Sequence, residues 1–167
     1  MQLEVDNLRA ALAHGEAETA SAEIALQLAQ RHVSRLGNLR EQVRRMDVLL
    51  QRHGTAVSPE LLVLCHWVQG MMAMNTLAFS SAERHFRAGL DVARSSGQEQ
   101  KEAWCLNELG NLMLTTGQLA EAEALMLESI AIKKRLGDWQ DAAIGMMNFG
   151  LIVLHRGDIV RARELYE

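Results

Sequence analysis

Proline is almost missing from this chain, which has one among 167 residues, and aromatic residues make up only 4%. Proline breaks helix interiors, so its scarcity leaves long uninterrupted helices possible along most of the sequence. Runs of β-branched residues are also few, which favours helix over strand. Because 49% of the residues are hydrophobic, the chain can bury the core of one domain. We therefore expect an all-α globular domain.

A basic excess and long apolar runs are also lacking. The formal net charge is −4, whereas proteins that bind nucleic acid directly usually carry a basic surface. No apolar run is long enough to span a bilayer, and Met1 does not begin a signal peptide. We expect a cytoplasmic protein with no direct contact to nucleic acid or membrane.

The two cysteines, Cys65 and Cys105, lie 40 residues apart. We expect them at equivalent places on stacked helices, too far apart for a disulfide, which needs Cα atoms within about 7 Å. Both are interpreted as reduced, buried residues of a cytoplasmic protein.

Residue patterns that carry catalysis or metal binding are missing too. The six histidines form no His-x-x-x-His pair and no His-Glu-x-x-His motif, and no Gly-Lys-Ser or Gly-Lys-Thr phosphate loop is present. His66 follows Cys65, but adjacent side chains on a helix point about 100° apart and rarely bind one ion together. Glu121, Glu123 and Glu128 lie near a helix start and are interpreted as a solvated face. We therefore predict no enzyme activity, no metal and no cofactor.

The chain does contain a repeat. Gly70, Gly110 and Gly150 recur at intervals of 40 residues. The same interval relates several further sets: Ala82, Ala122 and Ala162; Gly97 and Gly137; Gly37, Gly117 and Gly157, with Leu77 in the vacant place; Phe86, Met126 and Tyr166; Leu50, Leu90 and Ile130. A period of this size indicates a helical hairpin copied along the chain. Each glycine is expected at a close helix crossing, with the alanine and the large residue one turn later interlocking the hairpin.

Glycines and helix caps divide the chain into segments. Ser58 is expected to cap a helix that has Pro59 at its first position. The segments predicted are an N-terminal helix in 1–15, a degenerate hairpin in 19–54, repeats in 58–97 and 98–137, and a truncated repeat in 138–167. Because the connections are short, neighbouring helices should run antiparallel. We predict one domain, a right-handed superhelical α-solenoid.

The repeated residues resemble the tetratricopeptide repeat. The resemblance rests on the Leu109-Gly110 pair, the following Gly117, Ala122 and the large residue four positions later, and it covers 61–167 best. The usual repeat of that family has 34 residues, and this chain resembles its longer, 40-residue kind, with joints such as Gly137-Asp138. The resemblance implies a module that binds a protein or peptide.

A second resemblance lies at the N-terminus. The stretch from Glu4 to Leu12 is similar to the segment that opens the helical repeat region of MalT-like, AfsR-like and LuxR-type bacterial regulators. This implies a fragment of a larger bacterial protein of signal transduction and transcription regulation.

The resemblance to tetratricopeptide arrays also implies where a partner would bind. In those arrays the first helices of the hairpins line a concave groove. The corresponding positions here are Leu64, Trp67, Met71, Met74, Trp104, Asn107, Asn111, Leu114, Ile144, Met147 and Leu151. This surface is aromatic, rich in methionine and nearly uncharged, which favours an apolar peptide or helix. Trp67 and Met147 stand where a basic residue would be needed to bind a C-terminal carboxylate.

Other interpretations of the same residues stay open. Methionine and tryptophan at helical spacing also pack in cores, and another helix of the same polypeptide could close the groove. The alternative function is a small-molecule sensor of a transcriptional regulator, with Trp67, Trp104, Asn107 and Asn111 as the first wall of the inducer site. Finally, the apolar face of Ile159, Leu165 and Tyr166 predicts a homodimer through the last helix.

Overall fold

The structure is a computed structural model that describes residues 10, 44, 46–48, 50–52 and 57–166, without the side chains of 164–166. Apart from Ala10, the predicted N-terminal helix and the Glu4–Leu12 stretch lie outside the described residues, as does most of the predicted hairpin in 19–54. So do the side chains of Leu165 and Tyr166.

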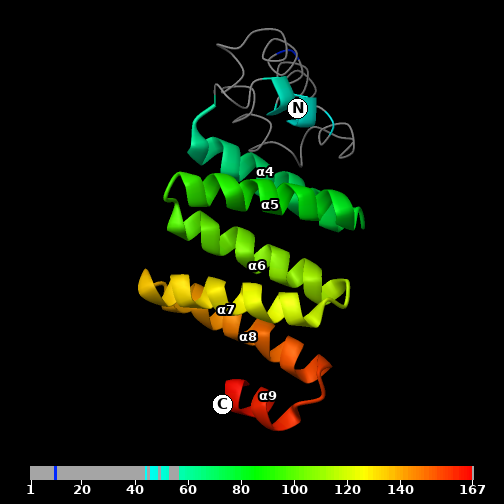
Figure 1. The fold of residues 1–167 in the computed structure, drawn as a ribbon, viewed down its shortest axis with the longest axis vertical. Helices are drawn as coiled ribbons and strands as arrows, with labels where there is room; N and C mark the ends of the chain where they lie inside the picture. The colour runs from blue at the N-terminus through cyan, green and yellow to red at the C-terminus, as the bar shows by residue number, and fades with distance from the viewer. Residues whose placement is uncertain (1–9, 11–43, 45, 49, 53–56, 167) are drawn as a thin grey trace.

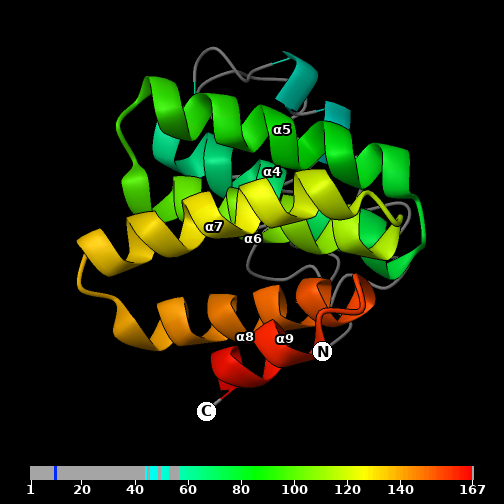
Figure 2. The same ribbon diagram turned by 60° about the horizontal axis from the view of Figure 1, so that its bottom comes forward.

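Six helices follow one another from residue 59 onward and stack along the long axis of the molecule (Figure 1). They are α4 (Pro59–Asn75), α5 (Phe79–Ser95), α6 (Glu99–Thr115), α7 (Leu119–Arg135), α8 (Trp139–His155) and α9 (Ile159–Tyr166). Each helix packs chiefly against the next one in the chain, and Figure 2 shows α4 and α6 behind α5 and α7. Three-residue joints make neighbouring helices antiparallel. The predicted all-α solenoid of helix hairpins is confirmed.

Side chains cap the starts of α4, α8 and α9, where Asp158 accepts from the backbone N–H of Arg161 at 3.1 Å in the last case. The Ser58 hydroxyl accepts a hydrogen bond from the backbone N–H of Leu61 at 3.4 Å, and Pro59 takes the first helical position as predicted. Asp138 begins α8 in the same manner, accepting from the N–H of Asp141 at 3.2 Å. These caps satisfy N–H groups that have no partner inside the helix.

Each joint turns through one residue in the left-handed conformation. Gly97, Gly117, Gly137 and Gly157 have φ values between 68° and 82°, which glycine adopts without steric strain. After α5, the N–H of Gln98 bonds the carbonyl of Ala93 at 2.9 Å, closing the helix end in a Schellman arrangement. Leu77 fills the same place after α4, with φ 58°.

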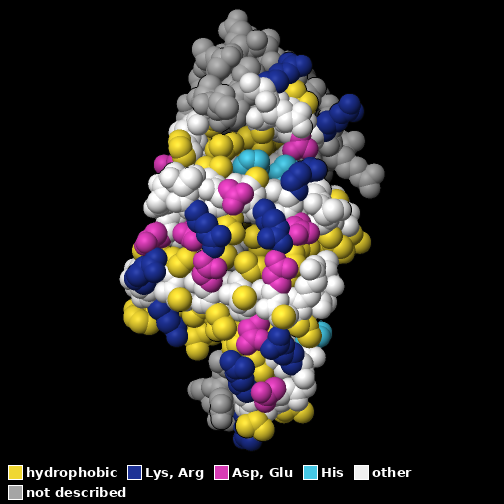
Figure 3. Space-filling view, in the orientation of Figure 1, with side chains coloured by type: hydrophobic (Ala, Val, Ile, Leu, Met, Phe, Trp, Pro, Cys, Tyr) yellow, Lys and Arg dark blue, Asp and Glu magenta, His cyan; other side chains and the backbone are white. Residues whose placement is uncertain are grey.

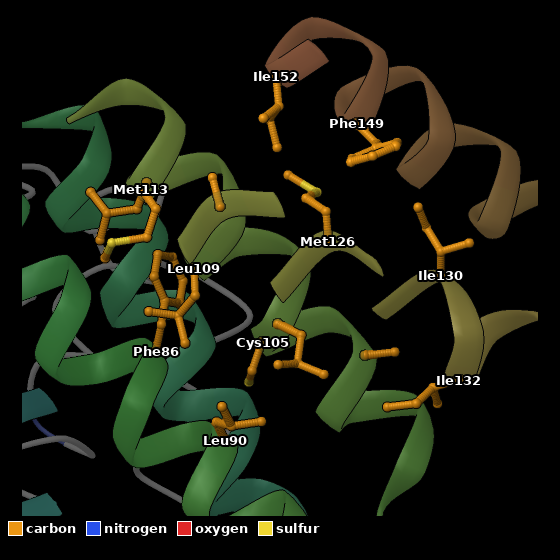
Figure 4. Packing of buried hydrophobic residues seen from close by; sticks show 14 of the residues in the cluster. Phe86, Leu90, Cys105, Leu109, Met113, Met126, Ile130, Ile132, Phe149 and Ile152 are labelled. Atoms are coloured by element: carbon orange, nitrogen blue, oxygen red, sulfur yellow. The ribbon is translucent and has the colours of Figure 1, made fainter. Parts of the chain in front are cut away.

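Two of the repeated glycines, Gly70 and Gly110, lie at close helix crossings as predicted. A Cβ atom on Gly70 would stand 2.3 Å from Cε1 of Phe86, and one on Gly110 would stand 2.9 Å from Cγ of Met126. Both large side chains are fully buried. Phe86 and Met126 belong to a continuous core that runs from one helix pair to the next (Figure 4).

Both cysteines are buried, and Cys105 belongs to that core. Cys65 and Cys105 are free thiols and fully buried, as predicted. Burial raises the pKa of each thiol to about 12, and near Cys105 the carboxylates of Glu108 and Glu102 act in the same direction. Such thiols behave as small apolar groups.

Ion pairs cover the face formed by α5 and α7, where Figure 3 shows acidic and basic side chains intermixed. Arg87 bonds Glu121 at 2.8 Å, and Arg94 bonds Glu128 at 2.6 Å. Both pairs connect α5 to α7, so they bridge the second helices of successive hairpins. Among the described helices, none is long and apolar enough to cross a membrane.

Candidate functional site

A pocket opens where the first helices of three hairpins come together. Its volume is about 370 Å³, and α4, α6 and α8 supply most of its walls. We call it the groove pocket, and its lining residues are Leu64, Trp67, Trp104, Asn107, Glu108, Lys133, Asp141 and Ile144.

Five of the predicted groove residues line this pocket, and the others lie along the same helices. Met71, Met74 and Leu114 are half-buried and pack against the core, so the core interpretation applies to them at least in part. Asn111 is half-buried beside Glu108. On α8, Leu151 and Met147 are exposed, Met147 by 57%.

The pocket is charged, contrary to the expectation of a nearly uncharged surface. The sequence interpretation missed Glu108, Lys133 and Asp141. Lys133 comes from α7, a second helix, and the matching residue one repeat earlier is Ala93. The sequence does contain a signal for Lys133, because a lysine stands there at the position where the preceding repeat has the buried alanine Ala93.

Lys133 is an almost fully buried cation. Lys133 is 5% exposed, and its Nζ donates a hydrogen bond to the backbone carbonyl of Asp141 at 3.4 Å. Burial lowers the pKa of Lys133, while the carboxylates of Asp141 and Glu108 oppose that shift. Buried charges are costly unless they are paired, so the ammonium makes this part of the pocket strongly polar.

The asparagines predicted for the groove hold Glu108. The side-chain amide of Asn107 donates to Oε1 of Glu108 at 3.3 Å, and that of Asn111 donates to Oε2 at 3.4 Å. The other end of the Asn107 amide is unsatisfied: Oδ1 is buried and has no hydrogen-bond partner among the described residues. The same holds for the indole Nε1 of Trp67. Two residues that line the pocket, Trp67 and Asn107, therefore each carry a buried polar atom without a partner among the described residues.

A second cluster, formed by Asp47, His66 and His85, lies beside a pocket of about 380 Å³. The two Nδ1 atoms of His66 and His85 are 3.3 Å apart, and Nε2 of His85 is 3.3 Å from Oδ1 of Asp47. Gln69 donates to the same carboxylate oxygen at 2.8 Å. We call this the histidine cluster.

Burial sets the charge states in the histidine cluster. It lowers the pKa of His66 to about 4, with a smaller contribution from His85. Burial would raise the pKa of Asp47, but the hydrogen bonds from His85 and Gln69 outweigh it and hold that pKa below its usual value. His66 is therefore neutral and Asp47 ionised near neutral pH. Within the described residues, no group of three or more His, Cys, Asp or Glu side chains could hold a metal ion.

Comparison with known proteins supports the repeat and the fold. Residues 103–138 match the family model described as tetratricopeptide repeat. The crystal structure of BtubC (BKLC) from P. vanneervenii is similar, with a TM-score of 0.71 and 19% sequence identity over 96% of this chain. This chain spans 66% of that one, just under two thirds of its length. No curated protein matches the sequence.

Proposed function

We propose that this chain, which carries a tetratricopeptide-type repeat, binds an extended peptide segment of a partner protein along α4, α6 and α8. Repeats of this type generally serve as scaffolds for protein–protein interaction and are typically not catalytic, so we also propose that the chain is not an enzyme. The unsatisfied atoms of the groove pocket are the observation that favours a peptide.

Those atoms match what a peptide backbone offers. An unpaired buried donor or acceptor costs about 1–3 kcal/mol. A peptide group supplies one carbonyl and one N–H, which would satisfy the Trp67 indole N–H and the Asn107 Oδ1 after a side-chain movement that exposes these buried atoms. Leu64 and Trp104 add apolar walls, and exposed Met147 extends the apolar surface along α8. Groove binding of this kind combines main-chain hydrogen bonds with side-chain pockets.

The test is selection of binders from a displayed random-peptide library, followed by variants of the groove. Replacing Trp67 and Met147 together by alanine should abolish binding of groove-directed peptides. Trp139→Ala is the matched control, because Trp139 is 65% exposed and does not line the groove pocket. Unchanged binding by the double variant would overturn the proposal.

A milder variant guards against misfolding. Trp67→Phe keeps an aromatic ring but removes the indole N–H, and its helicity and melting temperature should stay near those of the parent protein. We expect its peptide affinity to fall by about fivefold, the loss of one hydrogen bond.

The alternative is a small-molecule sensor, with Trp67, Trp104, Asn107 and Asn111 nearest to the ligand. The volume of the groove pocket, about 370 Å³, lies within the range of about 300–1,000 Å³ typical of small-ligand sites. A metabolite that raises the melting temperature of the parent protein but not of Trp67→Phe would favour this function.

The broader setting is also a proposal. The Glu4–Leu12 resemblance favours a cytoplasmic bacterial regulator of signal transduction and transcription, and the sequence of the intact gene would test it. The exposed apolar side chains of Ile159 and Val160 on α9 favour a homodimer through this helix. Sedimentation at high protein concentration should then show a dimer that Ile159→Glu dissociates, whereas a strict monomer would rule the dimer out.

A further inference from the structure

The described residues that line the groove pocket include two acidic side chains, Glu108 and Asp141, and one basic side chain, Lys133. Among the glutamates whose side chains are described, Glu108 alone makes no ion pair, whereas the others pair with arginine or lysine. No described cation pairs with Asp141 either. Among the described residues, Lys133 is the one cation that lines the pocket. Two carboxylates and a single, largely buried ammonium therefore line the described part of the pocket.

The pocket also has more acceptors than donors to offer a ligand. Both oxygens of Glu108 are held in place by the amide groups of Asn107 and Asn111, so this carboxylate is oriented before anything binds. The indole rings of Trp67 and Trp104 stand in the same pocket.

We propose that the groove pocket receives an arginine side chain of the bound peptide. A guanidinium carries one positive charge, which balances the pocket, and its planar fork of five N–H donors matches the carboxylate acceptors of Glu108 and Asp141. It also stacks on aromatic rings better than a lysine ammonium does. An acidic side chain would meet two carboxylates. This inference rests on the proposed peptide-binding function.

Small probes isolate this pocket from the rest of the groove. The three tryptophans give three indole N–H signals in a ¹⁵N-labelled sample, and their shifts can be followed while probes are added. The probes are the Nα-acetyl N-methylamides of arginine, lysine, norleucine and glutamate. We expect the arginine probe to shift the Trp67 and Trp104 signals, to leave the Trp139 signal in place, and to bind about tenfold more tightly than norleucine. Lysine should bind between these two, and glutamate most weakly.

Two substitutions of equal size separate charge from shape. Glu108→Gln should bring the arginine affinity down to that of norleucine without changing norleucine binding. Glu128→Gln is the matched control, because Glu128 pairs with Arg94 on the face formed by α5 and α7, and it should change neither affinity. Lys133→Met should leave arginine binding equal or tighter, since it removes a like charge from the pocket.

Other results would overturn the inference. Equal affinity for arginine and norleucine would make the pocket simply apolar, and absence of binding by all four probes would show that it takes no side chain. Preference for glutamate, lost in Lys133→Met, would identify an anion site. If peptides selected on the groove show no enrichment in arginine, the inference fails while the proposed function stands. If no peptide binds the groove, both fail.

Discussion

Replacing Gly70 by alanine should destabilise the fold far more than the same change at Gly110, although both glycines hold the same place in the repeat. An added Cβ at Gly70 would lie 2.3–2.8 Å from three ring carbons of Phe86. Phe86 is fully buried and its ring is rigid, so ring or helix must move. At Gly110 the nearest atoms are Cγ and Cε of Met126, at 2.9 and 3.0 Å, and a thioether chain can adjust.

The magnitudes follow from two opposing terms. Alanine gains about 1 kcal/mol over glycine in a helix interior. Overpacking a core costs about 1–3 kcal/mol and occasionally more, and the Gly70 contacts belong at the upper end of that range. We expect a net loss of about 2 kcal/mol for Gly70→Ala and a change within about 1 kcal/mol for Gly110→Ala.

Urea unfolding followed by circular dichroism measures both values, provided that the slope with denaturant stays constant. A second substitution tests the cause. Phe86→Leu should cost less in the Gly70→Ala background than alone, with a coupling energy of at least about 1 kcal/mol. A Gly70→Ala protein as stable as the parent, or strict additivity with Phe86→Leu, would refute the clash as the reason for this glycine.

Three further outcomes are expected. Leu77→Gly should raise the free energy of unfolding by about 1 kcal/mol, because Leu77 has φ 58° and is 74% exposed. Leu136→Gly is the control, because φ is −76° there, and it should not raise the free energy of unfolding. Equal effects of the two substitutions would contradict relief of the positive φ as the cause. Because the pKa of His66 falls from 6.5 to about 4 on folding, the unfolded chain binds more protons between these values, and stability should drop by up to about 3 kcal/mol as the pH falls through that interval. Chemical denaturation across that range would measure the drop, and His66→Gln should flatten it. The thiols of Cys65 and Cys105 should react with a disulfide reagent only through unfolding, so a rapid reaction of the native protein at pH 8 would contradict their burial.

The helices and their joints could be predicted because their signals are local. A glycine that permits positive φ, or a Ser or Asp that caps a helix, acts within a few residues. The shared period also placed Trp67 and Asn107 in one pocket, since residues 40 apart occupy equivalent places on stacked helices. Period and local signals were enough for the fold and for one wall of the site.

The remaining site features lie at positions where one copy of the repeat has a different type of residue from the next. Lys133 replaces an alanine of the preceding copy and reaches the groove pocket from the second helix. His66 and His85 stand where the next repeat has Leu106 and Leu125. Their contact depends on the spacing between two particular helices, which periodicity does not reveal.

The arginine bridges between α5 and α7 have a mechanical consequence. In a solenoid each unit contacts chiefly its neighbours, so the whole array can bend. Its curvature depends on the spacing between successive helices on each of its two sides. The bridges Arg87–Glu121 and Arg94–Glu128 tie one side together at about half-exposed positions, where dissolved salt weakens them. A change in ionic strength should therefore change the bending stiffness of the solenoid, and with it the width of the groove formed by α4, α6 and α8.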